Sequence, residues 1–249
     1  MSDRRFFVDP AAVGPARVEL AGDVLHHIVK VLRLTPGDEI VLLDGHGRHL
    51  RCELESISAG AGSARILEQW VEQERGLAIQ LIQSLPKGDK LDLVLQKGTE
   101  LGVTRFTPVS TERCVQQLDV KRGDKKQQRW QRIVAEAARQ SRRSILPLCD
   151  EVAPLAIALQ ECRQPLKLLL WEDESRPLAD RLPAVSPSGV AILVGPEGGF
   201  SRAEVDLALA NGFLPVSLGP RILRTETAGF AVTAVLEYLY GDFGVGNDA

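Results

Sequence analysis

The chain has 249 residues with 44% hydrophobic side chains, so it can bury one large core or two modest ones, and disorder is not expected. No segment approaches the roughly eighteen apolar residues of a membrane span, and the first residues lack the apolar run of a signal peptide, which predicts a cytoplasmic protein without a membrane partner. The formal net charge is −3, and the four cysteines include no C-x-x-C pair, which argues against a zinc ribbon and a disulfide framework.

Residues 1–72 have the pattern of a small β-rich domain. A turn is predicted at residues 35–38, a strand at residues 39–43 and a hairpin loop from residue 44. The next strand alternates apolar and charged side chains over residues 50–55, as expected when one face of a strand is buried. These elements predict a small barrel or sheet.

Shorter signals surround these strands. His26 and His27 are expected at the front of a short helix, in a packing or surface role. Small residues at 58–63 predict a loop, and residues 69–76 are expected to form the linker into a second domain.

From residue 73 to residue 249, predicted strands alternate with predicted helices. Strands are expected over residues 79–85, 106–109, 166–171, 190–194 and 213–218, and helices over residues 91–101, 127–142, 202–211 and 227–240. This alternation predicts a mostly parallel sheet that is covered by helices on both faces. The helix at 227–240 has almost no polar face, so we expect it to be buried in the core or against a partner.

Basic residues are concentrated in one segment. Between Arg113 and Arg143 there are ten basic and three acidic residues, a balance of +7, which leaves −10 on the rest of the chain. Such a segment is typical of a solvated helix face and also of a surface that follows phosphates. Trp130, within it, is a candidate to stack on a base but has the helical spacing of a core residue.

Two loops rich in glycine and proline, residues 192–201 and 217–228, carry the clearest functional signal. Each lies between a predicted strand and a predicted helix, where α/β proteins hold ligands. Neither has the P-loop pattern or the dinucleotide pattern G-x-G-x-x-G. Ser201 and Glu204 form a capping box, so the first loop suits a structural turn as well as a binding loop. The second loop favours binding, because five side chains crowd together there: Arg221, Arg224, Thr225, Glu226 and Thr227.

The loop sequences GPEGGFS (195–201) and LGPRILRTETA (218–228) resemble motifs of the SPOUT methyltransferase superfamily, and above all the RsmE-like uridine N3-methyltransferases of small-subunit ribosomal RNA. Four further segments occur in the family order and extend the resemblance over nearly the whole chain: residues 6–8, 26–33, 96–102 and 136–141. The chain departs from the pattern at Arg139, where an acidic residue is expected, and at Cys114, where serine is expected.

The resemblance implies an α/β fold with two parts. Residues 73–249 are expected to form a C-terminal trefoil-knotted SPOUT domain with a mostly parallel sheet, and residues 1–72 a small N-terminal PUA-like β-barrel that binds RNA. Periodicity alone does not predict a knot. A homodimer through the C-terminal helix, S-adenosyl-L-methionine as cofactor and small-subunit (16S) ribosomal RNA as substrate are also implied.

The resemblance also implies which residues form the sites. The cofactor is expected among Leu170, Glu172, Val194, Gly195, Pro196, Glu197, Gly198, Gly199, Leu218, Gly219, Ile222, Leu223, Arg224 and Thr227. RNA is expected to contact Lys87, Lys97, Arg113, Gln140 and Arg142, with Glu100 in the same cleft.

Methylation of uridine N3 requires help with a proton, because this nitrogen has no free lone pair until its proton leaves. All four histidines lie in the first fifth of the chain, so metal-free chemistry without histidine is expected at the loops. Arg224 is the first candidate, as the cation that stabilises charge on the uracil oxygens. Glu226 follows, ahead of Glu100 and Glu197, as proton acceptor, although an ion pair with an arginine suits Glu226 as well. Thr225 and Thr227 are candidates to cap the last helix.

Three other functions stay open at this point. A SPOUT methyltransferase acting on another base or on a ribose would have similar loops. A non-catalytic RNA-binding ribosome assembly factor would bind RNA without transferring methyl. A nucleotide-binding metabolic enzyme would bind a phosphorylated cofactor and no RNA.

Overall fold

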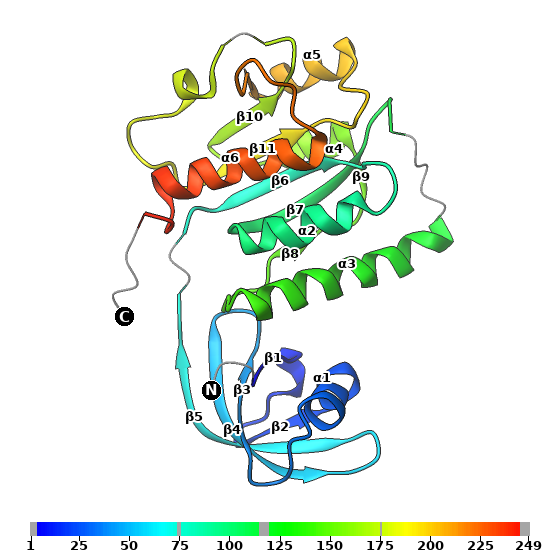
Figure 1. Cartoon of the computed structure of the whole chain (residues 1–249), viewed down its shortest axis with the longest axis vertical. Coiled ribbons are helices and arrows are strands. Elements are labelled where there is room, and N and C mark those ends of the chain that lie inside the picture. Colours follow the sequence, from blue (N-terminus) through cyan, green and yellow to red (C-terminus); the bar gives the residue numbers. More distant parts are fainter. Residues whose placement is uncertain (1–3, 74–75, 115–119, 175, 245–249) are drawn as a thin grey trace. The chain divides into compact units, whose positions relative to one another are not determined.

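The computed structural model describes residues 4–73, 76–114, 120–174 and 176–244 (Figure 1). The chain forms two compact units. The first comprises residues 1–74 and 138–146, and the second comprises residues 75–137 and 147–249. The segment that holds Gln140 and Arg142 therefore groups with the N-terminal unit, which the sequence pattern did not indicate.

The first unit is built on a curled five-stranded sheet with the order β1-β3-β4-β5-β2 (Figure 1). Its strands are β1 (Arg5–Phe7), β2 (Arg17–Leu20), β3 (Glu39–Leu43), β4 (Arg48–Ile57) and β5 (Gly62–Val71). β1 pairs with β3 in parallel, and the other pairs are antiparallel. Leu50, Cys52 and Leu54 of β4 are buried in one core, so the predicted alternation is confirmed.

The segment 138–146 is attached to this sheet by polar contacts. The Ser144 hydroxyl donates to the Glu72 carboxylate at 3.1 Å and lies 2.9 Å from Nε2 of the buried His49. Ile145 forms a β-bridge with His46. These contacts explain why a segment so late in the chain belongs to the first unit.

The turn at 35–38 and the hairpin after residue 44 are confirmed, since Asp38 accepts hydrogen bonds from the Thr35 amide and hydroxyl, and β3 pairs with β4. One detail was wrong. The short helix α1 (Gly22–His26) begins before His26, and His27 opens a π-helical turn, η2 (His27–Val31). The predicted loop is confirmed at residues 58–61, and the boundary between the two units falls inside the predicted linker 69–76. Backbone pairing with β4 extends β5 two to three residues into each of these segments. A short 3₁₀ turn, η1 (Pro10–Ala12), completes the unit.

The second unit contains a sheet in which every pair of neighbouring strands is parallel. Its order is β12-β10-β11-β6-β7-β8, with β9 also paired to β7. The strands are β6 (Ile79–Ser84), β7 (Val103–Ser110), β8 (Leu148–Cys149), β9 (Ala153–Pro154), β10 (Leu166–Leu170), β11 (Val190–Val194) and β12 (Leu214–Val216). The predicted parallel sheet is confirmed, whereas the trefoil knot stays a prediction.

Helices cover both faces of this sheet, as predicted. They are α2 (Lys90–Glu100), α3 (Val120–Gln140), α4 (Leu155–Glu161), α5 (Arg202–Ala210) and α6 (Thr225–Tyr240), with a 3₁₀ turn η3 (Leu178–Arg181). Along β11, Ile192 and its alternate neighbours join a core with α2, α3 and α6, whereas Leu193 joins a core with α4 and α5. Trp130 of α3 is buried in the first core, so the core interpretation of this residue is confirmed.

We expect Gly98→Ala to destabilise the protein by about 1–2 kcal/mol, because α2 packs closely on β7 at this position. A Cβ on Gly98 would lie 2.6 Å from the ring of Phe106, a buried side chain that has little room to move. Urea unfolding measures the effect, and Gln96→Ala on the exposed side of α2 is the control. A gain in stability would contradict this packing, since alanine is the better helix former.

Candidate functional site

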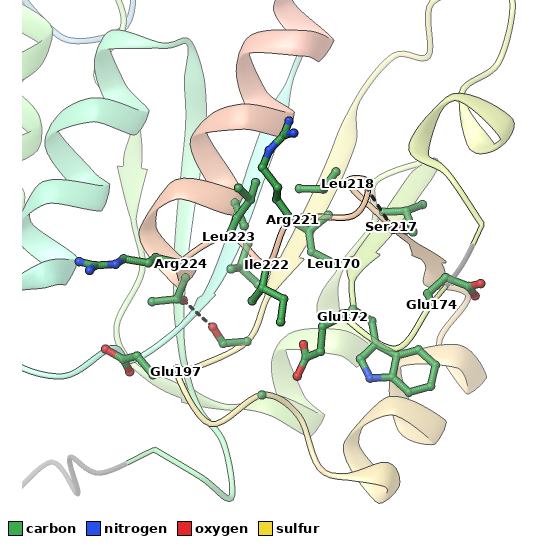
Figure 2. Close-up of a pocket in the computed structure, with 18 of the residues that line it drawn as sticks. Leu170, Glu172, Glu174, Glu197, Ser217, Leu218, Arg221, Ile222, Leu223 and Arg224 are labelled. Carbon is green, nitrogen blue, oxygen red and sulfur yellow. Dashed lines mark hydrogen bonds between the residues drawn. The ribbon is translucent and has the colours of Figure 1, made fainter.

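A cavity of about 560 Å³ lies at the carboxyl ends of β10, β11 and β12 (Figure 2). Its walls are the segment after β10, the loop after β11, the second loop and the first turn of α6. Ligands of open parallel sheets bind at this end of the strands. The two loops singled out in the sequence therefore meet around one space.

Most residues expected to hold a cofactor line this cavity, namely Leu170, Glu172, Val194, Gly195, Pro196, Glu197, Gly199, Leu218, Gly219, Ile222, Leu223 and Arg224. Gly198 and Thr227 do not line it. The role of each residue stays a prediction.

The wall also contains residues that were not among the expected cofactor-binding residues, namely Lys90, Trp171, Glu174, Val216, Ser217, Pro220, Arg221, Thr225 and Ala228. Arg221 and Thr225 stood in a recognised motif. Lys90 follows β6 through the turn at 85–89, which is the same strand–turn–helix arrangement as the two loops. This arrangement was the signal that could have found Lys90.

The first loop is a tight turn. The Gly199 amide donates to the Pro196 carbonyl at 3.0 Å, and Gly199 has a φ of +68°, which only glycine adopts easily. A Cβ at this position would collide with the Glu172 carboxylate. The predicted capping box is confirmed, because Ser201 and Glu204 exchange hydrogen bonds at the start of α5.

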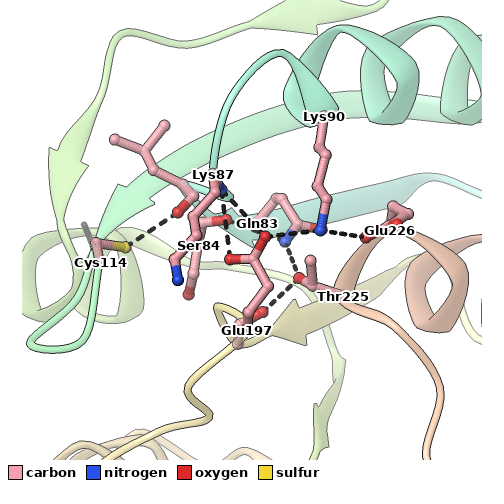
Figure 3. A network of polar contacts seen from close by, with 10 residues as sticks. Gln83, Ser84, Lys87, Lys90, Cys114, Glu197, Thr225 and Glu226 are labelled. Atoms are coloured by element: carbon pink, nitrogen blue, oxygen red, sulfur yellow. Dashed lines mark hydrogen bonds and ion pairs between the residues drawn. The ribbon is translucent and has the colours of Figure 1, made fainter. Parts of the chain in front are cut away.

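A chain of hydrogen bonds joins the end of β6, the loop after β11 and the start of α6 (Figure 3). The Gln83 amide at the end of β6 donates to the Thr225 hydroxyl at 2.9 Å, and this hydroxyl donates to the Gly195 carbonyl at 2.5 Å. Gln83 is 1% exposed, so the chain is shielded from water. It fixes the start of α6 against the loop after β11.

The prediction that Thr225 or Thr227 caps α6 was wrong. The helix begins at Thr225, its N-cap residue is Arg224, and no side chain caps it. The Thr225 hydroxyl is instead engaged with Gly195. The backbone carbonyl of Arg224 accepts from the Thr227 and Ala228 amides, while its exposed guanidinium extends away from Leu170 (Figure 2).

The three candidate carboxylates lie in different places. Glu197 lines the cavity and accepts a hydrogen bond from Lys90 at 2.8 Å. Glu226 does not line the cavity, and its Oε2 lies 3.6 Å from the Lys90 ammonium rather than beside an arginine. Glu100 lies at the other end of α2, about 15 Å from Lys90 by the helical rise, and pairs with Lys97 at 2.8 Å. The structure does not bring Glu100 to this cavity.

Lys90 and Glu197 shift each other's ionisation. Burial opposes the charge of Glu197, but hydrogen bonds from Lys90 and from the backbone outweigh it and hold the pKa of Glu197 below its usual value. The same hydrogen bond raises the pKa of Lys90. Both groups are therefore charged at neutral pH.

The residues expected to contact RNA fall into three groups. Lys87 and Arg113 lie beside the first loop, where the Lys87 amide donates to Glu197 and the Arg113 guanidinium donates to the Gly198 carbonyl at 2.8 Å. Lys97 pairs with Glu100, and Gln140 and Arg142 belong to the first unit.

The basic segment and its departures from the family pattern are only partly described. Residues 115–119 of the basic segment, which include Asp119, lie outside the described residues. At the position where serine was expected, the Cys114 thiol donates to the Leu85 carbonyl at 3.3 Å.

Comparison with known proteins decides the family. An RNA methyltransferase domain model matches residues 73–237, and an RNA methyltransferase PUA domain model matches residues 20–67. The ribosomal RNA small subunit methyltransferase E of Bacillus subtilis is 37% identical over 228 residues, which cover 88% of this chain and 89% of the relative. The chain belongs to the ribosomal RNA small subunit methyltransferase E family. The ribosomal RNA small subunit methyltransferase E of Synechocystis is 38% identical, and the match covers 94% of this chain and 77% of that relative.

Two solved structures are similar to nearly the whole chain. A methyltransferase from Legionella pneumophila in complex with its bound cofactor SAM has a TM-score of 0.89 and 35% identity, covering 98% of this chain and all of its own. The methyltransferase E of Neisseria gonorrhoeae bound to S-adenosyl methionine has a TM-score of 0.85 and 37% identity, covering 96% and 99%.

Two further observations concern metals and membranes. Within the described residues there is no cluster of three or more side chains suited to a metal ion. No helix in the same part of the chain is long and apolar enough to cross a membrane.

Proposed function

We propose that this methyltransferase family member transfers the methyl group of S-adenosyl-L-methionine to N3 of a uridine in small-subunit ribosomal RNA. The observation that carries the proposal is the cavity at the carboxyl ends of β10, β11 and β12, because both motif loops form its walls. The two solved relatives named above, from Legionella and Neisseria, carry this cofactor.

The cavity fits the cofactor in size and chemistry. Its volume of about 560 Å³ lies within the range of small-molecule sites. Leu170, Leu218 and Leu223 offer apolar surface for an adenine ring, and the backbone of the two glycine-rich loops offers amides and carbonyls for its polar edge. When bound, the cofactor supplies an activated methyl group.

The protein must then make uridine N3 nucleophilic. We assign to Arg224 the stabilisation of negative charge on the uracil oxygens, because this residue lines the cavity and its guanidinium is exposed beside it. The proton acceptor is one of two carboxylates, Glu197 or Glu226, since Glu100 is remote from the cavity. Lys87 and Arg113, beside the first loop, are proposed to contact RNA phosphates.

The experiment is a labelling assay. The purified protein is incubated with radiolabelled S-adenosyl-L-methionine and small subunits from a strain that lacks the corresponding gene, and the digested RNA is analysed by nucleoside. Label in N3-methyluridine is the expected result.

Other outcomes select between the alternatives. Label in another base or in a ribose would keep the methyltransferase and overturn the uridine N3 assignment. Binding of RNA without cofactor binding or label would indicate a non-catalytic assembly factor. Because the proposed substrate is ribosomal RNA, we also propose a cytoplasmic location.

We further propose a homodimer through α6. Val232 and Leu236 of this helix are buried in the core, whereas Val235, Tyr238 and Leu239, which lie at i, i+3 and i+4, are exposed at 41%, 68% and 50%. Adjacent exposed apolar side chains of this size are typical of an interface.

Replacing both Tyr238 and Leu239 by aspartate is expected to convert a dimer into a monomer. Two charges would have to be buried in an apolar contact. Light scattering coupled to gel filtration measures the mass of the protein in solution. Leu209→Asp, at an exposed position of α5, is the control. A monomeric wild-type protein at micromolar concentration would contradict the proposal.

A further inference from the structure

Lys90 connects two walls of the cavity. It is the first residue of α2 and lines the cavity itself. Its ammonium lies 2.8 Å from Glu197 Oε1, in the loop after β11, and 3.6 Å from Glu226 Oε2, in the first turn of α6 (Figure 3). One cation thus joins two carboxylates from segments that are separate in the chain.

The stability of α2 does not explain a lysine at this position. The amino end of a helix carries partial positive charge, so a cation there is unfavourable by about 0.3–1 kcal/mol. The N-cap residue, Asp89, makes no capping hydrogen bond that could offset it. The ion pairs with Glu197 and Glu226 compensate, and both link α2 to the cavity walls.

Glu226 depends on this contact more than Glu197 does. Glu197 also accepts from the Lys87 amide at 3.2 Å. The Oε2 atom of Glu226 is buried and has no hydrogen-bond partner among the described residues, and the Lys90 ammonium is the cation paired with it. Without that ammonium, two partly buried carboxylates would lie close together and repel.

We propose that Lys90 is a positioning residue for methyl transfer: by bridging Glu197 and Glu226, it holds the loop after β11 against the start of α6 and so fixes two walls of the cofactor cavity. This proposal rests on the proposed function. The buried chain of hydrogen bonds from Gln83 through Thr225 to Gly195 also joins these two segments. Lys90, which is partly exposed, therefore supplies a second attachment nearer the solvent.

The test compares Lys90→Met, which removes the charge at similar volume, with Lys90→Arg, which keeps it. Arg163→Gln, in the exposed loop after α4, controls for the loss of one positive charge. Calorimetry with S-adenosyl-L-methionine is expected to show affinity about tenfold weaker for Lys90→Met and within about threefold for Lys90→Arg and the control. The melting temperature should change by less than about 3 °C, because Lys90 is partly exposed.

A double variant separates loss of the bridge from repulsion between the two carboxylates. Adding Glu226→Gln to Lys90→Met removes the repulsion but does not restore the bridge, so cofactor affinity should stay about tenfold weaker than in the wild type. The comparison uses affinity for S-adenosyl-L-methionine, so a catalytic role of Glu226 would not change the result. Wild-type affinity in Lys90→Met, or full recovery in the double variant, would overturn the proposal.

Hydrogen exchange distinguishes failure of this proposal from failure of the proposed function. In ligand-free protein, Lys90→Met should speed exchange of the amides in the first turn of α6 and in residues 195–200, and the control should not. Faster exchange in a protein that binds no S-adenosyl-L-methionine would sustain the attachment by Lys90 and reject the cofactor. Unchanged exchange would reject the attachment.

Discussion

Arg224→Ala is expected to lower the rate of methyl transfer by about a hundredfold or more while leaving affinity for S-adenosyl-L-methionine within about threefold. Arg224 lines the cavity, and its exposed guanidinium extends outward from Leu170, where a uracil bound beside the cofactor could present its oxygens. The backbone of Arg224 starts α6, and alanine keeps that backbone. Single-turnover kinetics with ribosomal subunits and calorimetry measure the two quantities.

Two variants control for the loss of charge near RNA. Arg221→Ala removes another arginine from the same loop and the same cavity wall, so it shows what general loss of positive charge does. Arg224→Lys keeps the charge and loses the planar guanidinium, and an intermediate rate is expected. Equal loss of cofactor affinity and rate in Arg224→Ala would assign this arginine to cofactor binding instead.

Gly199→Ala is expected to weaken cofactor binding about tenfold or more. The backbone conformation at Gly199, with φ at +68°, costs an L-residue about 1–2 kcal/mol, and the new methyl group would also collide with the Glu172 carboxylate. Relief requires movement of the loop or of Glu172, both of which line the cavity. Calorimetry with S-adenosyl-L-methionine measures the loss.

Gly198→Ala is the matched control for the first loop. The methyl group at Gly198 would make only an ordinary contact, 3.4 Å from Cβ of Arg113, and Gly198 does not line the cavity. Affinity close to that of the wild type is expected. An equal loss in both variants would show that the loop tolerates no side chain at either position, and strain at Gly199 would then not be the cause.

The sequence predicted the second unit better than the first. Long apolar runs such as residues 190–194 predict buried parallel strands, because each of these residues faces a core. The strands β1 and β2 of the first unit are three and four residues long, too short for periodicity. Attachment of residues 138–146 to the first unit depends on contacts with His46, His49 and Glu72, which no local pattern reveals.

The cavity was predictable because it obeys a general rule of parallel sheets and because the two loops resemble known motifs. The position of Glu226 was not. Its carboxylate pairs with Lys90, a residue more than a hundred positions earlier, and the packing of α2 against α6 brings the two together. The capping prediction failed for the same reason, since the Thr225 hydroxyl has a tertiary partner in Gly195.

The order of strands in the second unit has a kinetic consequence. Ile79 pairs with Val190, and Leu168 with Leu214, so parallel strands far apart in the chain must meet before the sheet gains its hydrogen bonds. Bringing such distant strands together lowers the conformational entropy of the chain before their hydrogen bonds and packing form. Folding is therefore slow, and apolar strands stay exposed and prone to aggregation until the sheet is complete. We expect slow refolding from denaturant, with a yield that falls as protein concentration rises.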